Sequence, residues 1–253
     1  MNKRIDEKIY FLSDFHLGAP DHASSLKREK RIVGFLSSIQ HDATGIFIVG
    51  DLFDFWYEYK TVAPKGYVRI LGKLAELTDK GIPVYFFTGN HDMWMSGYFE
   101  KELNIPVYHE PQTFSFGNKK FLVGHGDGLG PGDEGYKFIK KIFRNRVCQW
   151  LFGALHPTWG MGIAGYFSRK SRQATGSTDK HFLGADKEWL IIYCKEVLEK
   201  EYFDYFVFGH RHLPIDYKLD DRSRYINLGD WIRYNSYAVF DGVELKLKYF
   251  DGE

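Results

Sequence analysis

Five short clusters of metal-type ligands each follow a strand-like apolar run in this chain. Aspartate, histidine and asparagine together suit borderline divalent metals, and more of them are present than one ion takes. A single Asp-x-His pair occurs by chance in many proteins, whereas five clusters at predicted strand ends indicate two metal ions and phosphoester chemistry. The clusters are Asp14-Phe15-His16, Gly50-Asp51-Leu52-Phe53-Asp54, Gly89-Asn90-His91-Asp92, Gly124-His125-Gly126-Asp127 and Gly209-His210-Arg211-His212.

The first two clusters supply carboxylates. Asp14 and His16 lie two residues apart, so both side chains point the same way if the preceding strand continues. A carboxylate can bridge two cations, and we expect Asp51 to be the bridge, with Gly50 allowing close backbone approach. Asp54 is expected to orient a ligand histidine.

The later clusters supply neutral ligands and a catalytic group. Asn90 offers a carbonyl oxygen, which commonly complements histidine around such metals. His125 and His210 are expected to complete one ion's ligand set. We expect His91 to face the substrate, with Asp92 holding its ring in the right tautomer.

Two cations define the chemistry that these residues favour. Held about 3.5–4 Å apart, they clamp both the attacking oxygen and the phosphoryl oxygens. A metal-bridging hydroxide then attacks phosphorus in line, and His91 offsets the charge that develops on the phosphoryl or leaving group. No covalent enzyme intermediate is needed.

The elements that position the first three clusters alternate between strand and helix patterns. Short runs rich in β-branched and aromatic residues lie directly before the clusters, at Ile9–Leu12, Gly45–Val49 and Val84–Thr88. Helical spacing of apolar residues covers Leu26–Gln40 and Gly66–Lys80 between them. This order predicts a largely parallel sheet whose strand ends carry the site.

Later in the chain the pattern predicts more strands. Gly117-Asn118 and Asp241-Gly242 are hairpin turn signals. We expect two sheets, the later one more antiparallel, with helices outside, in one domain spanning residues 1–253. The expected later strands are Thr113–Phe116, Lys120–Gly124, Tyr205–Phe208, Arg224–Leu228, Ser236–Phe240 and Leu245–Phe250.

Residues 128–186 interrupt the strand pattern with aromatic and basic residues. From 137 to 187 there are ten Lys or Arg and two Asp, so this segment is basic although the whole chain has a net charge of +1. Such a segment attracts an anionic partner. It is either an inserted helical cap that covers a lipid or a membrane interface, or a packed cap with solvated basic residues.

Composition places the chain among globular proteins. Its 253 residues are 44% apolar and 26% charged, which suits one sizeable core. The polar start and the lack of eighteen consecutive apolar residues lead us to expect no signal peptide and no membrane span. Two cysteines, Cys148 and Cys194, argue against a disulfide framework and fit a reducing cytoplasm.

The ordered pattern of the five clusters resembles the calcineurin-like metallophosphoesterase superfamily, whose motifs are D-x-H, G-D-x-x-D, G-N-H-D/E, H and G-H-x-H. The resemblance covers nearly the whole chain and implies a four-layer αββα sandwich with a dinuclear site. It also implies the two ligand sets. One ion takes Asp14, His16, Asp51 and His212, and the other takes Asp51, Asn90, His125 and His210.

A narrower resemblance is to the UDP-2,3-diacylglucosamine pyrophosphohydrolases of lipid A synthesis. It rests on His125–Leu129, Gln149–Phe152, Ile163-Ala164 and Leu228–Trp231. That family hydrolyses the pyrophosphate bond at the α-phosphate, releasing UMP and 2,3-diacylglucosamine 1-phosphate. Many members carry arginine where this chain has His91. The implied substrate contacts are Asn90, His91, Asp127, Asp133, Tyr136, Ser171, Lys180 and His210.

The resemblance also implies cofactors, partners and location. Mn²⁺ is the expected metal, with Mg²⁺ or iron as alternatives, because these ligand types tolerate all three. The expected partner is an amphiphilic nucleotide-sugar lipid, with peripheral contact to the cytoplasmic face of the inner membrane. Neither nucleic acid nor an obligate protein partner is expected.

Two other functions stay open at this point. The chain is alternatively a phosphoesterase for a soluble nucleotide or phosphodiester, although a small soluble nucleotide has no use for a dry aromatic cleft. It is alternatively a scaffold without metal, resembling the phosphoesterase-like retromer subunit. The intact set of predicted ligands argues against the scaffold.

Overall fold

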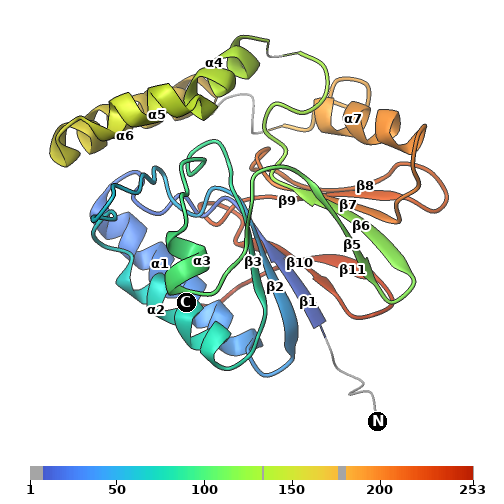
Figure 1. Ribbon diagram of the computed structural model, residues 1–253. Helices are drawn as coiled ribbons and strands as arrows, with labels where there is room; N and C mark the ends of the chain where they lie inside the picture. The colour runs from blue at the N-terminus through green and yellow to red at the C-terminus, as the bar shows by residue number, and fades with distance from the viewer. Residues whose placement is uncertain (1–7, 133, 176–180, 253) are drawn as a thin grey trace.

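The computed structural model describes residues 8–132, 134–175 and 181–252, and in these ranges the strands form two sheets (Figure 1). The first sheet has the order β11-β10-β1-β2-β3-β4, and the second has the order β5-β6-β7-β9-β8. The strands are β1 (Lys8–Leu12), β2 (Ala43–Val49), β3 (Val84–Phe87), β4 (Val107–Tyr108), β5 (Gln112–Phe116), β6 (Lys119–Gly124), β7 (Tyr205–Phe208), β8 (Pro214–Lys218), β9 (Arg224–Leu228), β10 (Ser236–Phe240) and β11 (Leu245–Tyr249).

Helices cover the outer face of each sheet, so the predicted four-layer αββα sandwich is confirmed. Figure 1 shows α1 and α2 against the first sheet and α7 against the second, with α4, α5 and α6 outside these layers. The helices are α1 (His22–Ile39), α2 (Val68–Asp79), α3 (Tyr98–Glu102), α4 (Glu134–Arg144), α5 (Arg146–Gly153), α6 (Pro157–Thr175) and α7 (Trp189–Leu198).

Alternation of side chains along each strand builds the layers. In β2, Ile46 and Ile48 pack toward α1 and α2, whereas Phe47 and Val49 enter the apolar layer between the two sheets. The second sheet behaves in the same way, since Val207 of β7 faces the first sheet while its neighbours face α7. Successive strand residues point to opposite faces, so strands covered on both sides read as continuous apolar runs.

The strand pairing differs in part from the expected one. The parallel order of β1, β2 and β3 is confirmed. In the second sheet, however, β6, β7 and β9 are parallel, and only the edge strands β5 and β8 run antiparallel. The long helical segment between β6 and β7 allows the crossover that a parallel pair requires. The last hairpin returns to the first sheet, where β10 pairs with β1.

Helix boundaries follow local capping chemistry. Helix α1 begins at His22, four residues before the predicted start, because the Asp21 carboxylate accepts a hydrogen bond from Ser24 N at 2.9 Å. Helix α2 begins only at Val68, since Tyr67 has a left-handed backbone with φ of 56°. The elements α3, β4 and β8 were not predicted; they are short or polar.

The helices α4, α5 and α6 occupy most of the predicted cap segment. Two half-buried aromatic residues outside the cap form hydrogen bonds to these helices. Tyr57 donates to the Gln149 carbonyl at 2.8 Å, and Trp94 Nε1 donates to the Phe143 carbonyl at 2.6 Å. Both donors come from loops after β2 and β3. The cap is thereby attached beside the ends of the strands that carry the clusters. In the described residues we find no helix with the length and apolarity needed to cross a membrane.

Candidate metal centre

The fold brings the five predicted clusters to one place. They follow β1, β2 and β3, which are neighbours in the first sheet, and β6 and β7, which are neighbours in the second. Four side chains each offer a ligand atom within 4.8 Å of the others, a group that could hold a metal ion. These are Asp14, His16, Asp51 and His212.

The backbone of the first cluster differs from the sequence-based expectation. Strand β1 ends at Leu12, and Asp14 and His16 then adopt left-handed φ angles of 56° and 44°. Their side chains reach the site through this turn and not through a continued strand. Hydrogen bonds from Asp14 N to the Gly50 carbonyl (3.1 Å) and from His16 N to the Asp51 carbonyl (2.9 Å) hold the turn against the second cluster.

The two buried aspartates share one arrangement. Asp14 Oδ2 accepts a hydrogen bond from His210 N at 3.0 Å, and Asp51 Oδ1 accepts one from His91 N at 2.9 Å. The other oxygen of each carboxylate, Asp14 Oδ1 and Asp51 Oδ2, is buried and makes no hydrogen bond among the described residues, but faces a histidine nitrogen, His212 Nε2 at 3.2 Å and His125 Nε2 at 3.4 Å. Buried carboxylate charge is costly unless a positive charge lies close to it. The residues therefore fit a divalent ion.

Asp51 faces both halves of the site. Its Oδ2 lies 3.7 Å from His16 Nε2 and 3.4 Å from His125 Nε2. His16 belongs to the first group of ligands, and His125 to the second. This position is the one that a bridging carboxylate requires.

The second group gathers around Asn90. Its Oδ1 lies 2.9 Å from His210 Nδ1 and 3.3 Å from His125 Nε2. His125 Nδ1 lies 2.8 Å from the Val49 carbonyl, which can only accept, so Nδ1 carries the proton. His125 Nε2 is then the atom turned toward Asp51 and Asn90, as metal ligation requires.

Electrostatics at the site also suit cations. Burial lowers the pKa of His16 to about 3 and that of His210 to about 4, so both are neutral near pH 7, the form that binds a metal. Burial opposes the charged form of His125 too, but the Asp51 carboxylate outweighs it and raises the His125 pKa to about 10. Without a metal, a proton on His125 supplies the positive charge that Asp51 needs, and a divalent cation can replace it.

Asp92 has a role other than the predicted one. Its Oδ2 accepts from Leu52 N at 2.8 Å and its Oδ1 accepts from Gly89 N at 2.7 Å. Asp92 thus holds the loop after β2 and the loop after β3 together. The His91 ring is held instead by the backbone of Asp54, because His91 Nδ1 lies 2.9 Å from that carbonyl oxygen. The expectation that Asp92 sets the tautomer of His91 is therefore wrong.

Asp54 lies between two histidine rings. Its Oδ1 is 3.9 Å from His16 Nδ1 and 3.8 Å from His91 Nδ1. The carboxylate thus faces one predicted ligand and the predicted catalytic histidine. Ser168 of α6 also reaches His91, with its Oγ 3.2 Å from Nδ1, a contact that the sequence did not indicate.

Two glycines are required by close packing against the ligands. A Cβ at Gly50 would lie 2.3 Å from His125 Nδ1, and one at Gly89 would lie 2.2 Å from Asp51 Oδ1. No side chain fits at either position. The expectation that Gly50 allows close approach is confirmed.

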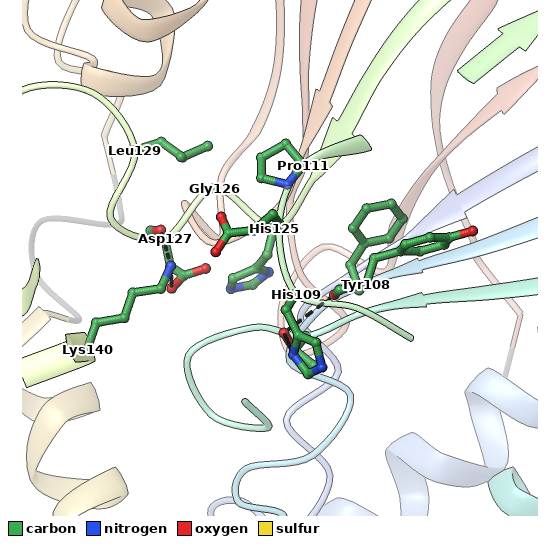
Figure 2. A pocket seen from close by; sticks show the side chains of 11 residues that line it. Tyr108, His109, Pro111, His125, Gly126, Asp127, Leu129 and Lys140 are labelled. Carbon is green, nitrogen blue, oxygen red and sulfur yellow. Dashed lines mark hydrogen bonds and ion pairs between the residues drawn. The ribbon is translucent and has the colours of Figure 1, made fainter. Parts of the chain in front are cut away.

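Asp127 and Tyr136 lie beside the second ligand group, and their role as substrate contacts stays a prediction. Tyr136 donates to Asp127 Oδ2 at 2.7 Å, and Lys140 Nζ lies 2.6 Å from the same oxygen. Figure 2 shows Lys140 and Asp127 on one side of the His125 ring and His109 on the other, around a narrow cavity of about 10 Å³ that has room for no more than a water molecule.

Three predicted substrate contacts cannot be placed. Asp133 and Lys180 lie outside the described residues, and Ser171 falls within helix α6 with a side chain outside the described part. Their assignment stays a prediction.

A larger cavity of about 500 Å³ opens between the cap and the metal loops. Its polar lining residues are Asp54, Asn90, His91, Tyr136 and Ser168. The other lining side chains are apolar, from the loops after β2 and β3 and from α4, α5 and α6. They are Phe55, Trp56, Met93, Trp94, Ile139, Phe143, Phe152, Ile163, Ala164 and Phe167.

An αββα sandwich whose strand ends gather aspartate, histidine and asparagine side chains around Asp51 defines the class of metallophosphoesterases. The chain belongs to the calcineurin-like phosphoesterase family, which matches residues 7–214. Together with the ligand group, this makes it an enzyme that uses divalent metal.

Two relatives of this chain carry the same name. A protein of Porphyromonas gingivalis named UDP-2,3-diacylglucosamine hydrolase is 40% identical, covering 95% of this chain and 97% of its own length. A Shewanella protein of the same name is 28% identical, covering 90% of this chain and 91% of its own. Among solved structures, the phosphoesterase Yfce of E. coli is 18% identical with a TM-score of 0.44, covering 92% of this chain and 87% of its own.

Proposed function

We propose that this protein hydrolyses UDP-2,3-diacylglucosamine at the α-phosphate, giving UMP and 2,3-diacylglucosamine 1-phosphate. The observation that carries the proposal is the apolar cavity of about 500 Å³ whose polar lining residues include Asn90 and His91. Acyl chains in this cavity would bring the attached phosphate to the ligand cluster. The name of the 40% identical relative supports the same substrate.

The composition of the cavity also argues against a soluble nucleotide as substrate. Phe152, Phe167 and Trp94 present carbon surface that only an apolar group would cover. Ligand sites bind by matching such surface, with a few polar groups fixing orientation. The polar lining residues Ser168 and Asp54 lie near His91, at 3.2 and 3.8 Å from its Nδ1, so the cavity offers polar groups beside the ligand cluster together with a large apolar surface, as an amphiphile requires.

The proposed metal ions are two, with Mn²⁺ preferred and Mg²⁺ or iron as alternatives. The proposed ligand sets are Asp14, His16, Asp51 and His212 for one ion, and Asp51, Asn90, His125 and His210 for the other. When bound, such ions supply Lewis-acid charge stabilisation and activate water near neutral pH.

His91 supplies the protein's own catalytic group in this proposal. Because its Nδ1 proton is committed to the Asp54 carbonyl oxygen, Nε2 is the nitrogen that exchanges a proton with the substrate. A proton held at Nε2 offsets negative charge on the phosphoryl or leaving-group oxygen. Asp127, held by Tyr136 and Lys140, is proposed to contact the glucosamine or phosphate groups.

The cap is proposed to rest on the cytoplasmic face of the inner membrane. Phe138, Trp150 and Trp159 are 65%, 71% and 70% exposed, and the basic residues Lys141 and Arg146 are exposed on the same helices. Aromatic and basic side chains together favour an anionic lipid surface. No nucleic acid and no obligate protein partner enter the proposal.

Vesicle binding tests the membrane contact. Sedimentation with phosphatidylglycerol vesicles is expected to pellet the protein, and Trp150→Ser combined with Trp159→Ser is expected to leave most of it in the supernatant. Phosphatidylcholine vesicles serve as the control for charge. Equal sedimentation of the variant and the unchanged protein would contradict the proposed surface.

Direct assay tests the reaction. Purified protein loaded with Mn²⁺ is incubated with detergent-dispersed UDP-2,3-diacylglucosamine, and the products are identified by mass spectrometry. The expected products are UMP and 2,3-diacylglucosamine 1-phosphate. Release of UDP, or hydrolysis of UDP-glucose at the same rate, would overturn the assignment.

Phe152→Ser is expected to slow hydrolysis of the acylated substrate by roughly 10–200-fold, because lost apolar contact in a pocket is worth about that much. Turnover of bis(p-nitrophenyl) phosphate, which has no acyl chain, should change little. Val62→Ser is the matched control, since Val62 is 53% exposed, lies outside the cap and does not line the cavity. Equal losses on both substrates for Phe152→Ser would count against an acyl cavity.

A further inference from the structure

Arg211 lies between two proposed ligands of different ions, His210 and His212. Its side chain is fully buried and is among the largest side chains in the described residues with no exposed surface. The two histidines reach Asn90 and Asp14, whereas Arg211 contacts Glu188 at the start of α7. A buried arginine in the loop Gly209–His212, here called the metal loop, therefore links the site to helix α7.

The contact between Arg211 and Glu188 is bidentate. Arg211 Nε lies 3.0 Å from Glu188 Oε2, and Nη2 lies 3.0 Å from Glu188 Oε1. Both side chains have no exposed surface, so neither charge is screened by solvent. Two parallel charge-assisted hydrogen bonds fix orientation as well as distance. Trp189 stacks over the guanidinium at 5.3 Å and limits its movement further.

Glu188 also anchors the chain that returns from the cap. Its Oε1 accepts from Leu183 N at 3.0 Å, and Arg211 Nη2 donates to the His181 carbonyl at 2.8 Å. The ion pair thus joins three segments: the metal loop, the stretch around 181–183 and the first turn of α7.

The metal loop needs an external anchor because its backbone is strained. His210 and His212 have left-handed φ angles of 68° and 51°. A residue other than glycine in this region is strained and persists only where the surroundings hold it there. Arg211 lies between these two residues, and its side chain is held by Glu188 at the start of helix α7.

We propose that Arg211 and Glu188 are a positioning pair that holds His210 and His212 in their ligand orientations, one for each metal ion. Neither residue touches the substrate or the reacting atoms. The inference rests on the metal centre alone and is independent of which phosphoester is hydrolysed. Arg211 is the sequence neighbour of one proposed ligand of each ion. Loss of the Arg211–Glu188 pair should therefore lower the affinity for both ions.

Glu188→Gln is the main test, because it keeps the size of the side chain and the acceptor for Leu183 N while removing the charge. Metal-free protein is titrated with Mn²⁺, and the free ion is measured by electron paramagnetic resonance. We expect both Mn²⁺ affinities to fall by roughly 10–100-fold, as for other groups that orient metal ligands. Arg211→Lys, which loses the fork, should show the same loss.

Controls separate positioning from general stability. Lys73→Met removes another buried cation, far from the site on α2, and should keep both affinities. Arg211→Met combined with Glu188→Leu removes both charges of the pair together, so neither is left buried alone, and should unfold near the temperature of the unchanged protein. Weak Mn²⁺ binding in this folded double variant supports the proposal, and it decides the question if a single variant does not fold. Unchanged affinity for both ions in the double variant or in the folded single variants would overturn it.

Discussion

Asp51→Asn is expected to abolish turnover and to release both metal ions. The carboxylate oxygen Oδ2 faces both His16 and His125, at 3.7 and 3.4 Å from their Nε2 atoms. Asparagine keeps an acceptor for His91 N but places an NH₂ donor, or a neutral oxygen, where the charge is needed. Activity should drop by at least about 10³-fold, since charge stabilisation by the ions depends on this residue.

Metal analysis and kinetics together check this result. Protein is purified, freed of loosely bound ions by gel filtration, and analysed for Mn²⁺ by mass spectrometry. Asp204→Asn is the matched control, because Asp204 is another buried carboxylate but lies before β7, at the opposite end of the strand from the metal loop. Two retained ions with near-normal turnover in Asp51→Asn would remove Asp51 as the bridge.

The bridging position of Asp51 depends on how the two sheets pack. Asp51 follows β2 of the first sheet, whereas His125 follows β6 of the second. The distance between them is set by the apolar layer between the sheets, which includes Phe47 and Val49 just before Asp51. Close-packed aromatic layers transmit small volume changes. Core substitutions near these strand ends therefore act on the distance between Asp51 and His125.

The sequence predicted those parts of the fold that depend on local pattern. Buried strands of both sheets are continuous apolar runs, and Tyr205–Phe208, Arg224–Leu228 and Ser236–Phe240 were predicted with the observed bounds. Clusters at strand ends predicted the meeting of Asp14, His16, Asp51 and His212 because parallel strands end at one edge. Periodicity and strand-end chemistry are local, so they can be read without coordinates.

Local sequence pattern does not show which strands pair or which remote groups a side chain contacts. Strand β10 pairs with β1, whose sequence separation exceeds two hundred residues, and nothing within Ser236–Phe240 states which sheet it joins. The carboxylate of Asp92 bonds to the backbone of two other loops, and the tautomer of His91 is set by a carbonyl oxygen. Backbone acceptors carry no sequence signal. The Arg211–Glu188 pair was missed for the related reason that its partners are remote.

Trp150 and Phe152 lie two residues apart on α5 and have different surroundings. Phe152 lines the cavity, while Trp150 is 71% exposed. Residues two apart on a helix point to opposite sides. The helical spacing therefore already required that only one of them enter the cavity, and the other becomes available for the membrane.

His91→Ala is expected to lower turnover by roughly 10²–10³-fold while both metal ions stay bound. The loss follows from removing one positioned donor to the charge that develops on the substrate. Metal is retained because the backbone N–H of His91, which holds Asp51 Oδ1 at 2.9 Å, does not depend on the side chain. Substrate affinity should change less than the catalytic rate, since the donor acts mainly in the transition state.

The structure also suggests an alternative role for His91, that of a metal ligand, and the His91→Ala experiment distinguishes the two roles. His16, Asp54 and His91 offer ligand atoms within 4.8 Å of one another, a second group that could hold an ion. If His91 were a ligand, alanine would lower the metal content and excess Mn²⁺ would restore turnover. If His91 is the catalytic donor, excess Mn²⁺ does not restore turnover. The control His41→Ala, at an exposed histidine, should change neither the catalytic rate nor the metal content. The contact of His91 with the backbone of Asp54 and with Ser168 favours the donor, because both contacts leave Nε2 for the substrate.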